Sequence, residues 1–171
     1  MTLKELLLKS HEALSGSAVD HALIGGFALA ALGVARATND VDFLINETQK
    51  ELAKKALTRA GWSIELETDE VIQFGTQGNL DLLIARRTLS KKMLENAKPI
   101  DSLGIKCLSA EAIIGLKIQA YKNDPKREFQ DKADIQSLIF KYKGSLNWEE
   151  IKAYADLFGE TAFIDQLKAQ K

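Results

Sequence analysis

The spacing of apolar residues changes twice along the chain, and each change predicts a different kind of element. Leucines recur at helical spacing over residues 2–15, which predicts an amphipathic helix that ends near Gly16. Short apolar runs then predict strands, with helices between them over residues 27–33 and 47–61. The predicted strands are "HALI", "NDVDFLI", "WSIELE", "VIQFGT" and "NLDLLIA". From Ser109 onward the spacing is helical again.

The order of these elements predicts the fold class. The strands come early and the helices come late, which is typical of an α/β or α+β fold with a helical C-terminal part. At 171 residues the chain is long enough for one sizeable core. We therefore expect a sheet region with an N-terminal helix over residues 1–108. A helical part over residues 109–171 would pack on it to form a single compact unit.

Composition and charge exclude several classes of protein. Apolar residues make up 46% of the chain and charged residues 27%, which is typical of a folded globular protein. The formal net charge is −1, so the overall charge indicates neither nucleic acid nor membrane as a partner. Cys107 is the only cysteine, which rules out an intrachain disulfide and a thiolate metal cluster. No run of eighteen apolar residues is present, and charged residues interrupt the N-terminal apolar positions, so we expect no membrane span and a cytoplasmic location.

Two aspartates stand one residue apart in the predicted strand "NDVDFLI". Because side chains alternate along a strand, Asp40 and Asp42 point to the same side of it. Two carboxylates this close repel at neutral pH unless a proton or a cation lies between them. Asp81 has a similar setting in "NLDLLIA" and joins the pair if its strand lies beside theirs. Carboxylates without a nearby histidine or cysteine favour Mg²⁺, and three of them can hold two metal ions for phosphoryl or nucleotidyl transfer.

The glycine pair Gly25–Gly26 stands between a predicted strand and a predicted helix. Glycine lets a phosphate approach the backbone, and the N–H groups at a helix start favour an anion. The pair is not a P-loop, because the Gly-Lys-Ser/Thr ending is absent. Taken separately, the glycines could form a tight turn and the aspartates could cap a turn or face water. Together and in this order, these residues favour a catalytic site.

With these motifs the chain resembles the nucleotidyltransferase superfamily, which has the polymerase-beta-like fold. The family pattern is Gly-Gly opening a helix, Asp-x-Asp on the next strand and a third Asp on a later strand. The form "GGFALAALGVARATNDVDFLI", with Arg36 and Thr38 before the acidic pair, is similar to a bacterial branch that includes AbiEii-type abortive-infection toxins.

The C-terminal half adds to this resemblance. "SAEAIIGLKIQAY" contains Lys117, and "QDKADIQSL" follows Arg127 and contains Asp131 and Asp134. Gln130 departs from the branch, whose members often carry lysine there, and this leaves one phosphate or substrate contact open. The resemblance covers roughly residues 20–140.

The resemblance implies a mixed, twisted sheet flanked by helices. It also implies transfer of a nucleoside monophosphate from a nucleoside triphosphate to an acceptor hydroxyl, with loss of pyrophosphate. Two Mg²⁺ ions, or Mn²⁺ in their place, are the implied cofactors. The implied catalytic residues and metal ligands are Asp40, Asp42 and Asp81, and Asp81 would act as the base or orient it. The implied nucleotide-binding residues are Gly25, Gly26, Arg36, Thr38, Lys117, Arg127, Asp131 and Asp134.

Several of these residues also have a structural interpretation. Lys117 either reaches the triphosphate or extends from the edge of its helix towards solvent. Arg127, Asp131 and Asp134 have helical spacing and would alternatively form surface ion pairs. Arg36 either clamps a phosphate or base, or pairs with a carboxylate and positions the strand.

The leading hypothesis is a magnesium-dependent nucleotidyltransferase whose acceptor is an RNA end such as that of tRNA, a protein or a small molecule. The basic segment "RRTLSKK", residues 86–92, is either an RNA contact or a solvated helix face. A role in phage defence or in a toxin–antitoxin pair, with a cognate antitoxin as partner, is expected from the resemblance alone. One alternative is a catalytically silent binding or regulatory module of the same fold. Another is a metal-dependent phosphohydrolase, which the scarcity of histidines disfavours.

Overall fold

The computed structural model describes residues 1–100 and 104–170, and these residues form two compact units. The sheet unit consists of the described residues of Met1–Ala31 and Ala35–Leu108. The helical unit consists of the described residues of Leu32–Val34 and Ser109–Lys171. Each unit has its own core, so each is described by itself.

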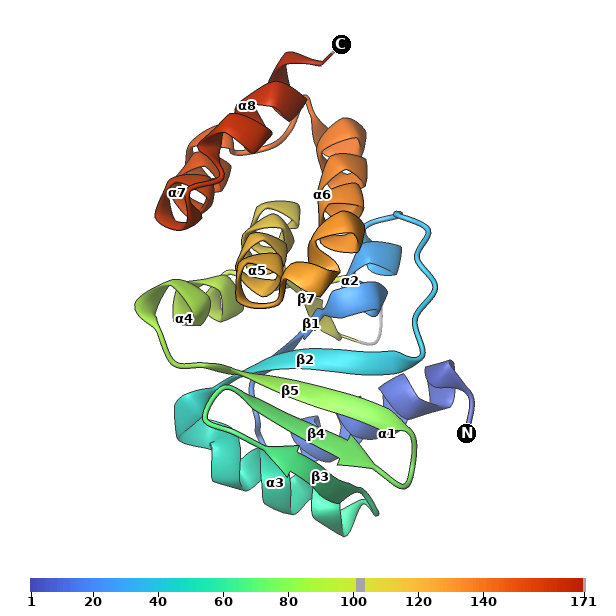
Figure 1. Ribbon diagram of the computed structural model, residues 1–171. Coiled ribbons are helices and arrows are strands. Elements are labelled where there is room, and N and C mark those ends of the chain that lie inside the picture. Colours follow the sequence, from blue (N-terminus) through green and yellow to red (C-terminus); the bar gives the residue numbers. More distant parts are fainter. Residues whose placement is uncertain (101–103, 171) are drawn as a thin grey trace. The chain divides into compact units, whose positions relative to one another are not determined.

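A mixed sheet is the centre of the first unit (Figure 1). Among the described residues its seven strands lie in the order β3-β4-β5-β2-β1-β7-β6. Their bounds are β1 His21–Ile24, β2 Asp40–Asn46, β3 Ser63–Glu67, β4 Val71–Gly75, β5 Asn79–Ala85, β6 Lys98–Pro99 and β7 Lys106–Cys107. Strands β2 and β5 are parallel, as are β1 and β7, whereas the other neighbours are antiparallel. The strand of Asp81 therefore lies directly beside the strand of Asp40 and Asp42.

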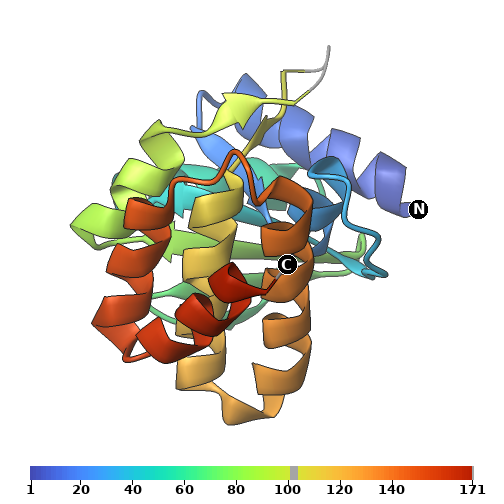
Figure 2. The same ribbon diagram turned by 90° about the horizontal axis from the view of Figure 1, so that it is seen from above.

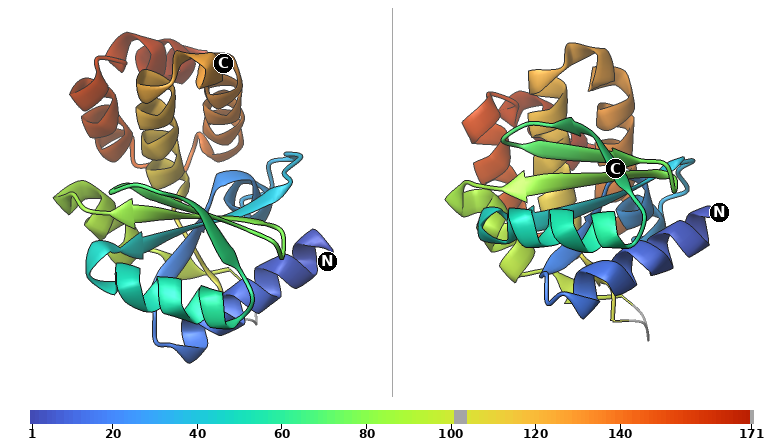
Figure 3. Two further views of the ribbon diagram at one scale, coloured as in Figure 1. Left: turned by 60° about the horizontal axis from the view of Figure 1, so that its bottom comes forward. Right: turned by 90° about the horizontal axis from the view of Figure 1, so that it is seen from below.

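Helices α1 (Leu3–Gly16) and α3 (Lys50–Arg59) lie on one face of this sheet (Figure 3). We call this side the covered face. Phe43, Ile72 and Phe74 point to it and are at most 1% exposed. His21 also points there, because its ring contacts Phe43 edge-on and its Nε2 lies 2.8 Å from Nδ1 of His11 on α1. The alternation of each strand thus leaves Asp40, Asp42 and Asp81 on the opposite face, which we call the aspartate face.

The other helices of the sheet unit are short. They are α2 (Gly25–Ala31), the 3-10 helix η1 (Glu47–Gln49) and α4 (Thr88–Glu95). Helix α2 starts two residues earlier and ends two residues earlier than the sequence predicts, and the 47–61 helix begins as η1. Strands β6 and β7 were not predicted, because two residues are too few to show a periodicity.

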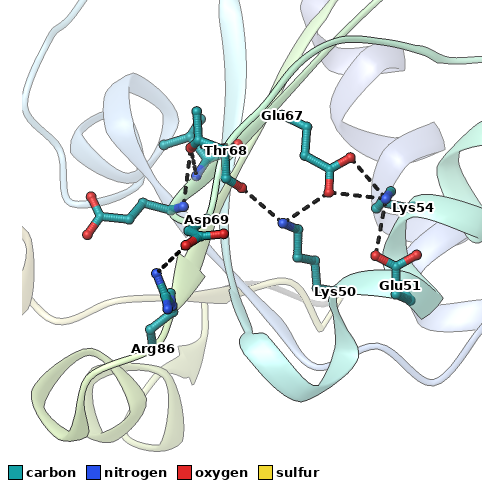
Figure 4. A network of polar contacts seen from close by, with 9 residues as sticks. Lys50, Glu51, Lys54, Glu67, Thr68, Asp69 and Arg86 are labelled. Atoms are coloured by element: carbon teal, nitrogen blue, oxygen red, sulfur yellow. Dashed lines mark hydrogen bonds and ion pairs between the residues drawn. The ribbon is translucent and has the colours of Figure 1, made fainter.

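Ion pairs connect the edge strand β3 to α3 (Figure 4). Glu67 lies 3.0 Å from Nζ of Lys50 and 2.9 Å from Nζ of Lys54. Lys50 also donates to the carbonyl oxygen of Thr68 at 2.9 Å. These contacts hold the C-terminal end of β3 against α3, the helix that packs on the covered face.

The helical unit contains α5 (Ala110–Asn123), the 3-10 helix η2 (Pro125–Arg127), α6 (Glu128–Tyr142), α7 (Trp148–Phe158) and α8 (Thr161–Ala169). Caps mark two helix starts, since the side chains of Ser109 and Asn147 accept hydrogen bonds from the backbone of α5 and α7. Helices α5 and α6 run side by side (Figure 2). The Tyr142 hydroxyl donates to the carbonyl oxygen of Leu32 at 2.7 Å, which attaches residues 32–34 to this unit. No helix of the described residues is long and apolar enough to cross a membrane.

Candidate active site

The three aspartates predicted from the sequence lie on one face of two adjacent strands. Asp42 on β2 is the register partner of Asp81 on β5, and Asp40 is the register partner of Asn79. Register partners in a sheet point to the same side, so the three carboxylates share the aspartate face. All three residues are partly exposed, whereas Val41, Leu80 and Leu82 between them are fully buried. The sheet therefore presents the carboxylates and hides the apolar residues that flank them.

Neutral donors hold two of these carboxylates. The Thr38 hydroxyl donates to Oδ1 of Asp40, and the Gln73 amide on β4 donates to Oδ2 of Asp81 at 3.1 Å. Burial raises the pKa of the Asp81 carboxyl above its usual value, the Gln73 hydrogen bond opposes this rise, and the charges of Asp40 and Glu65 add to it. Asp81 is therefore a better proton acceptor than an ordinary solvated aspartate.

The glycine pair packs against two of the predicted site residues. Gly25 has a φ of +64°, and a Cβ there would meet Oδ2 of Asp42 at 2.0 Å. A Cβ at Gly26 would meet Cβ of Thr38 at 2.5 Å. No side chain fits at either position without displacing its neighbour, and the positive φ at Gly25 also favours glycine. The structure thus brings together Gly25, Gly26, Thr38, Asp40, Asp42 and Asp81.

These residues suit Mg²⁺ by the chemistry of their donors, since hard cations prefer carboxylate oxygens. Among the described residues, however, no three His, Cys, Asp or Glu side chains converge closely enough to enclose an ion. The hydrogen bonds from Thr38 and Gln73 help to explain this, because each orients its carboxylate separately.

Comparison with known families assigns the chain. Residues 3–168 match the family described as "Nucleotidyl transferase of unknown function (DUF2204)". The chain belongs to this family. The predicted enzyme class, a nucleotidyltransferase, is therefore confirmed. No curated protein matches the chain.

Solved structures of nucleotidyltransferases share the fold. The complex of ANT(2")-Ia with adenylyl-2"-tobramycin has a TM-score of 0.68 at 17% identity, over 92% of this chain and 97% of that one. The lincomycin-bound lincosamide adenylyltransferase LnuA has a TM-score of 0.57 at 18% identity, over 81% of this chain and 96% of that one. An antigenic nucleotidyltransferase-like protein from Paracoccidioides brasiliensis has a TM-score of 0.54 at 21% identity, over 95% of this chain and 93% of that one. The predicted nucleotidyltransferase fold is thus confirmed.

The remaining predicted residues of this nucleotidyltransferase include a buried cluster in the helical unit. Nζ of Lys117 lies 2.9 Å from Oδ1 of Asp131 and 2.7 Å from Oδ2 of Asp134. Nε of Arg127 lies 3.1 Å from Oδ2 of Asp131, and the Gln130 amide donates to Oδ1 of Asp134 at 3.0 Å. Lys117, Asp131 and Asp134 are 8%, 2% and 4% exposed, so they are neither solvent-facing nor a surface ladder.

The predicted arginines lie at partly or fully exposed positions, and the basic segment has acidic neighbours. Arg36 is partly exposed in the segment before β2, and Arg127 ends η2 rather than lying within the helix that follows. In the basic segment, Arg86 pairs with Asp69 at 3.3 Å and Lys91 pairs with Glu47 at 2.6 Å. Arg87 lies 3.7 Å from Glu70. Neighbouring acids thus offset much of the charge that an RNA would need.

Sequence reasoning missed two polar residues on the aspartate face. Gln73 contacts Asp81, and the Glu65 side chain lies over Gly75, two residues from Gln73 along β4. The strand pattern of "VIQFG" could have indicated Gln73, because it is polar between Ile72 and Phe74. No such signal exists for Glu65, because a register shift in β3 changes which residues share a face.

Proposed function

We propose that this protein transfers a nucleoside monophosphate from a nucleoside triphosphate to a hydroxyl of a small molecule. The observation that carries the proposal is the shared face of Asp40, Asp42 and Asp81 beside the Gly25–Gly26 turn, in a chain of a nucleotidyltransferase family. Because Gly25 and Gly26 have no side chains, Asp42 and Thr38 pack directly against the backbone at the start of α2, where the triphosphate would bind.

Asp40, Asp42 and Asp81 would hold Mg²⁺, which neutralises the phosphates and polarises the α-phosphate when it is bound. Asp81 takes the proton of the acceptor hydroxyl. The acceptor oxygen forms a bond to the α-phosphorus, and the bond from that phosphorus to the leaving pyrophosphate oxygen breaks. The products are the nucleotidylated acceptor, pyrophosphate and the proton on Asp81. Gln73 keeps the Asp81 carboxylate turned towards the site.

Two points support a small-molecule acceptor over RNA or a protein. Acidic partners offset the basic segment, which weakens the case for RNA. ANT(2")-Ia and LnuA, which share the fold, are solved with adenylyl-2"-tobramycin and lincomycin. Nucleotide binding by Arg36, Lys117, Arg127, Asp131 and Asp134, membership of the AbiEii-type branch, and a role in phage defence with an antitoxin partner all stay predictions.

Calorimetry with each of the four ribonucleoside triphosphates and Mg²⁺ tests the proposal. We expect magnesium-dependent binding by the wild-type protein and its loss in the variant Asp40→Asn/Asp42→Asn. Pyrophosphate release with an acceptor should be lost in the same variant. If the folded wild-type protein binds none of the four nucleotides, the chain is instead a catalytically silent module.

A further inference from the structure

The edge strand β3 adds a fourth carboxylate to the aspartate face. The register between β3 and β4 shifts between Ile64 and Leu66, which makes Glu65 the extra residue of a β-bulge. A Cβ at Gly75 would meet Oε1 of Glu65 at 1.6 Å, so the Glu65 side chain lies directly over this glycine. Gly75 and Gln73 are two residues apart on β4 and present the same face, and Gln73 contacts Asp81. Glu65 therefore shares the face of Asp81.

Its neighbour Glu67 has the opposite environment. Glu67 points to the covered face and contacts Lys50 and Lys54 of α3 at 3.0 and 2.9 Å (Figure 4). Glu65 is exposed, and no Lys, Arg or His of the described residues forms an ion pair with it. Its negative charge acts on the site, because it contributes to the raised pKa of Asp81. One of two glutamates on the same strand is thus neutralised by the fold, and the other is left to the solvent or to a ligand.

Glu65 lies nearer the edge of the sheet than the three aspartates. Gln73 is the register partner of Asp81 and Phe74 that of Leu80, which places Gly75 diagonally from Asp81. Diagonal neighbours on adjacent strands are about 7–8 Å apart. The Glu65 carboxylate lies over Gly75, so it is one strand further from β2 than Asp81. Glu65 is therefore placed to contact a second group of a molecule that is bound at Asp81.

The surface between Asp81 and the sheet edge suits part of an organic molecule. Leu66 is the register partner of Gln73, shares its face and is 48% exposed. Moving outward from Asp81, the strands thus present an amide, an exposed apolar side chain and the Glu65 carboxylate. A free carboxylate there repels a phosphate backbone and attracts a protonated amine.

We propose that Glu65 determines acceptor specificity by binding a protonated amine of the molecule whose hydroxyl is placed at Asp81. The hydroxyl of a preferred acceptor then lies at Asp81 on β5, and its amine lies towards the sheet edge at Glu65 on β3. The amine is bound and not consumed, so the transfer step is unchanged. This inference rests on the proposed nucleotidyl transfer. It adds that the acceptor molecule carries a positive charge.

The test compares charged and neutral forms of the same hydroxyl compounds. The probes are amino sugars and aminocyclitol antibiotics, tobramycin among them, each paired with its fully N-acetylated form. Pyrophosphate release is measured with Mg²⁺ and each nucleoside triphosphate for the wild type, Glu65→Gln, Glu65→Lys and the matched control Glu67→Gln. Thermal unfolding of each variant checks that it is folded.

We expect the wild type to use at least one free amine 10-fold or more efficiently than its acetylated form. Glu65→Gln should raise the KM for that amine at least 10-fold, leave nucleotide binding nearly unchanged and change kcat much less than KM, because Glu65 makes the smallest contribution to the pKa of Asp81. Glu65→Lys should abolish the preference, and Glu67→Gln should keep the wild-type KM. Equal use of the acetylated forms, or an unchanged KM in Glu65→Gln, would overturn the inference.

Nucleotide binding separates this inference from the proposed function. If the wild type binds a nucleoside triphosphate and Asp40→Asn/Asp42→Asn does not, yet no amine of the panel reacts, the cationic acceptor is wrong and nucleotidyl transfer stands. If no nucleotide binds, both proposals fail.

Discussion

Each unit of this protein contains a group of aspartates, and the two groups have different partners. In the helical unit, Asp131 and Asp134 are at most 4% exposed and lie within 3 Å of Nζ of Lys117. In the sheet unit, Asp40 and Asp81 are partly exposed and accept hydrogen bonds from the uncharged side chains of Thr38 and Gln73.

The difference shows which group can contribute to stability and which can bind a cation. A buried carboxylate with a lysine beside it is already neutralised, and removing the lysine leaves an uncompensated buried charge. A half-buried carboxylate held by a neutral donor keeps its charge and its remaining lone pairs for a ligand. We therefore assign a structural role to the Lys117 cluster and the catalytic role in our proposal to the aspartate face.

The largest expected effect is on activity, from the Asp81→Asn variant. Loss of the proton acceptor should lower kcat by about 10³-fold or more, as is usual for groups that act together in one site. Stability should not fall, because burial disfavours the charge that this change removes. Pyrophosphate release and urea unfolding measure the two effects. A variant that is active, or that is inactive because it is unfolded, would contradict this role for Asp81.

The second effect is on stability, from the Lys117→Met variant. Breaking a buried ion pair by removing one partner costs about 3–5 kcal/mol, and we expect a loss of this size in urea unfolding. The matched control is Lys122→Met on the same helix, whose contact with Glu160 at 3.0 Å is at the surface. The control should lose less than about 1 kcal/mol. If Lys117→Met unfolds like the wild type but does not bind nucleotide, Lys117 belongs to the site and the comparison fails.

A third effect combines stability and activity in the Gly25→Ala variant. A Cβ at this position meets Asp42, and alanine at a φ of +64° is strained. Non-glycine residues in this region of φ cost about 1–3 kcal/mol, so we expect a loss in that range together with reduced nucleotide binding. Gly16→Ala is the control, because nothing lies within 4 Å of its added Cβ. Wild-type binding by Gly25→Ala would show that the close packing against Asp42 is not required.

The smallest effect is on the pH dependence of stability. Because the pKa of Asp81 is higher in the folded protein than its usual value of 3.8, the folded state binds the proton more tightly. Its contribution to stability is therefore fully present below pH 3.8 and declines as the pH rises through the folded pKa. Unfolding of the wild type and Asp81→Asn between pH 3 and about 7 measures this. The free-energy difference between them should shift in favour of the variant as the pH rises, and a constant difference would contradict the raised pKa.

Much of the fold and part of the candidate site could be predicted from the sequence. The phase of "NDVDFLI" indicates that Asp40 and Asp42 share a face, and the Gly-Gly motif indicates the turn beside them. Leucine spacing predicts α1, and Thr2 and Glu5 form its capping box. These features depend on neighbouring residues in the chain, and local periodicity and steric freedom determine them.

The roles of Lys117, Asp131 and Asp134 could not be predicted in this way. Their spacing fits a surface ladder as well as a binding site, and burial alone distinguishes the ion cluster that they form. The β3 bulge is a second case, because the pairing with β4 determines that Glu65 and Glu67 serve opposite faces.

The sequence by itself determined strands β1 to β5, most of the helices and the type of carboxylate motif, because hydrophobic periodicity and backbone preference act within a few residues. Tertiary structure decided that β5 lies beside β2, so that Asp81 is the register partner of Asp42. It also decided which carboxylates are neutralised and which keep their charge. The physical reason is that strand order, register and burial depend on contacts between residues far apart in the chain, and a single sequence does not specify those contacts locally.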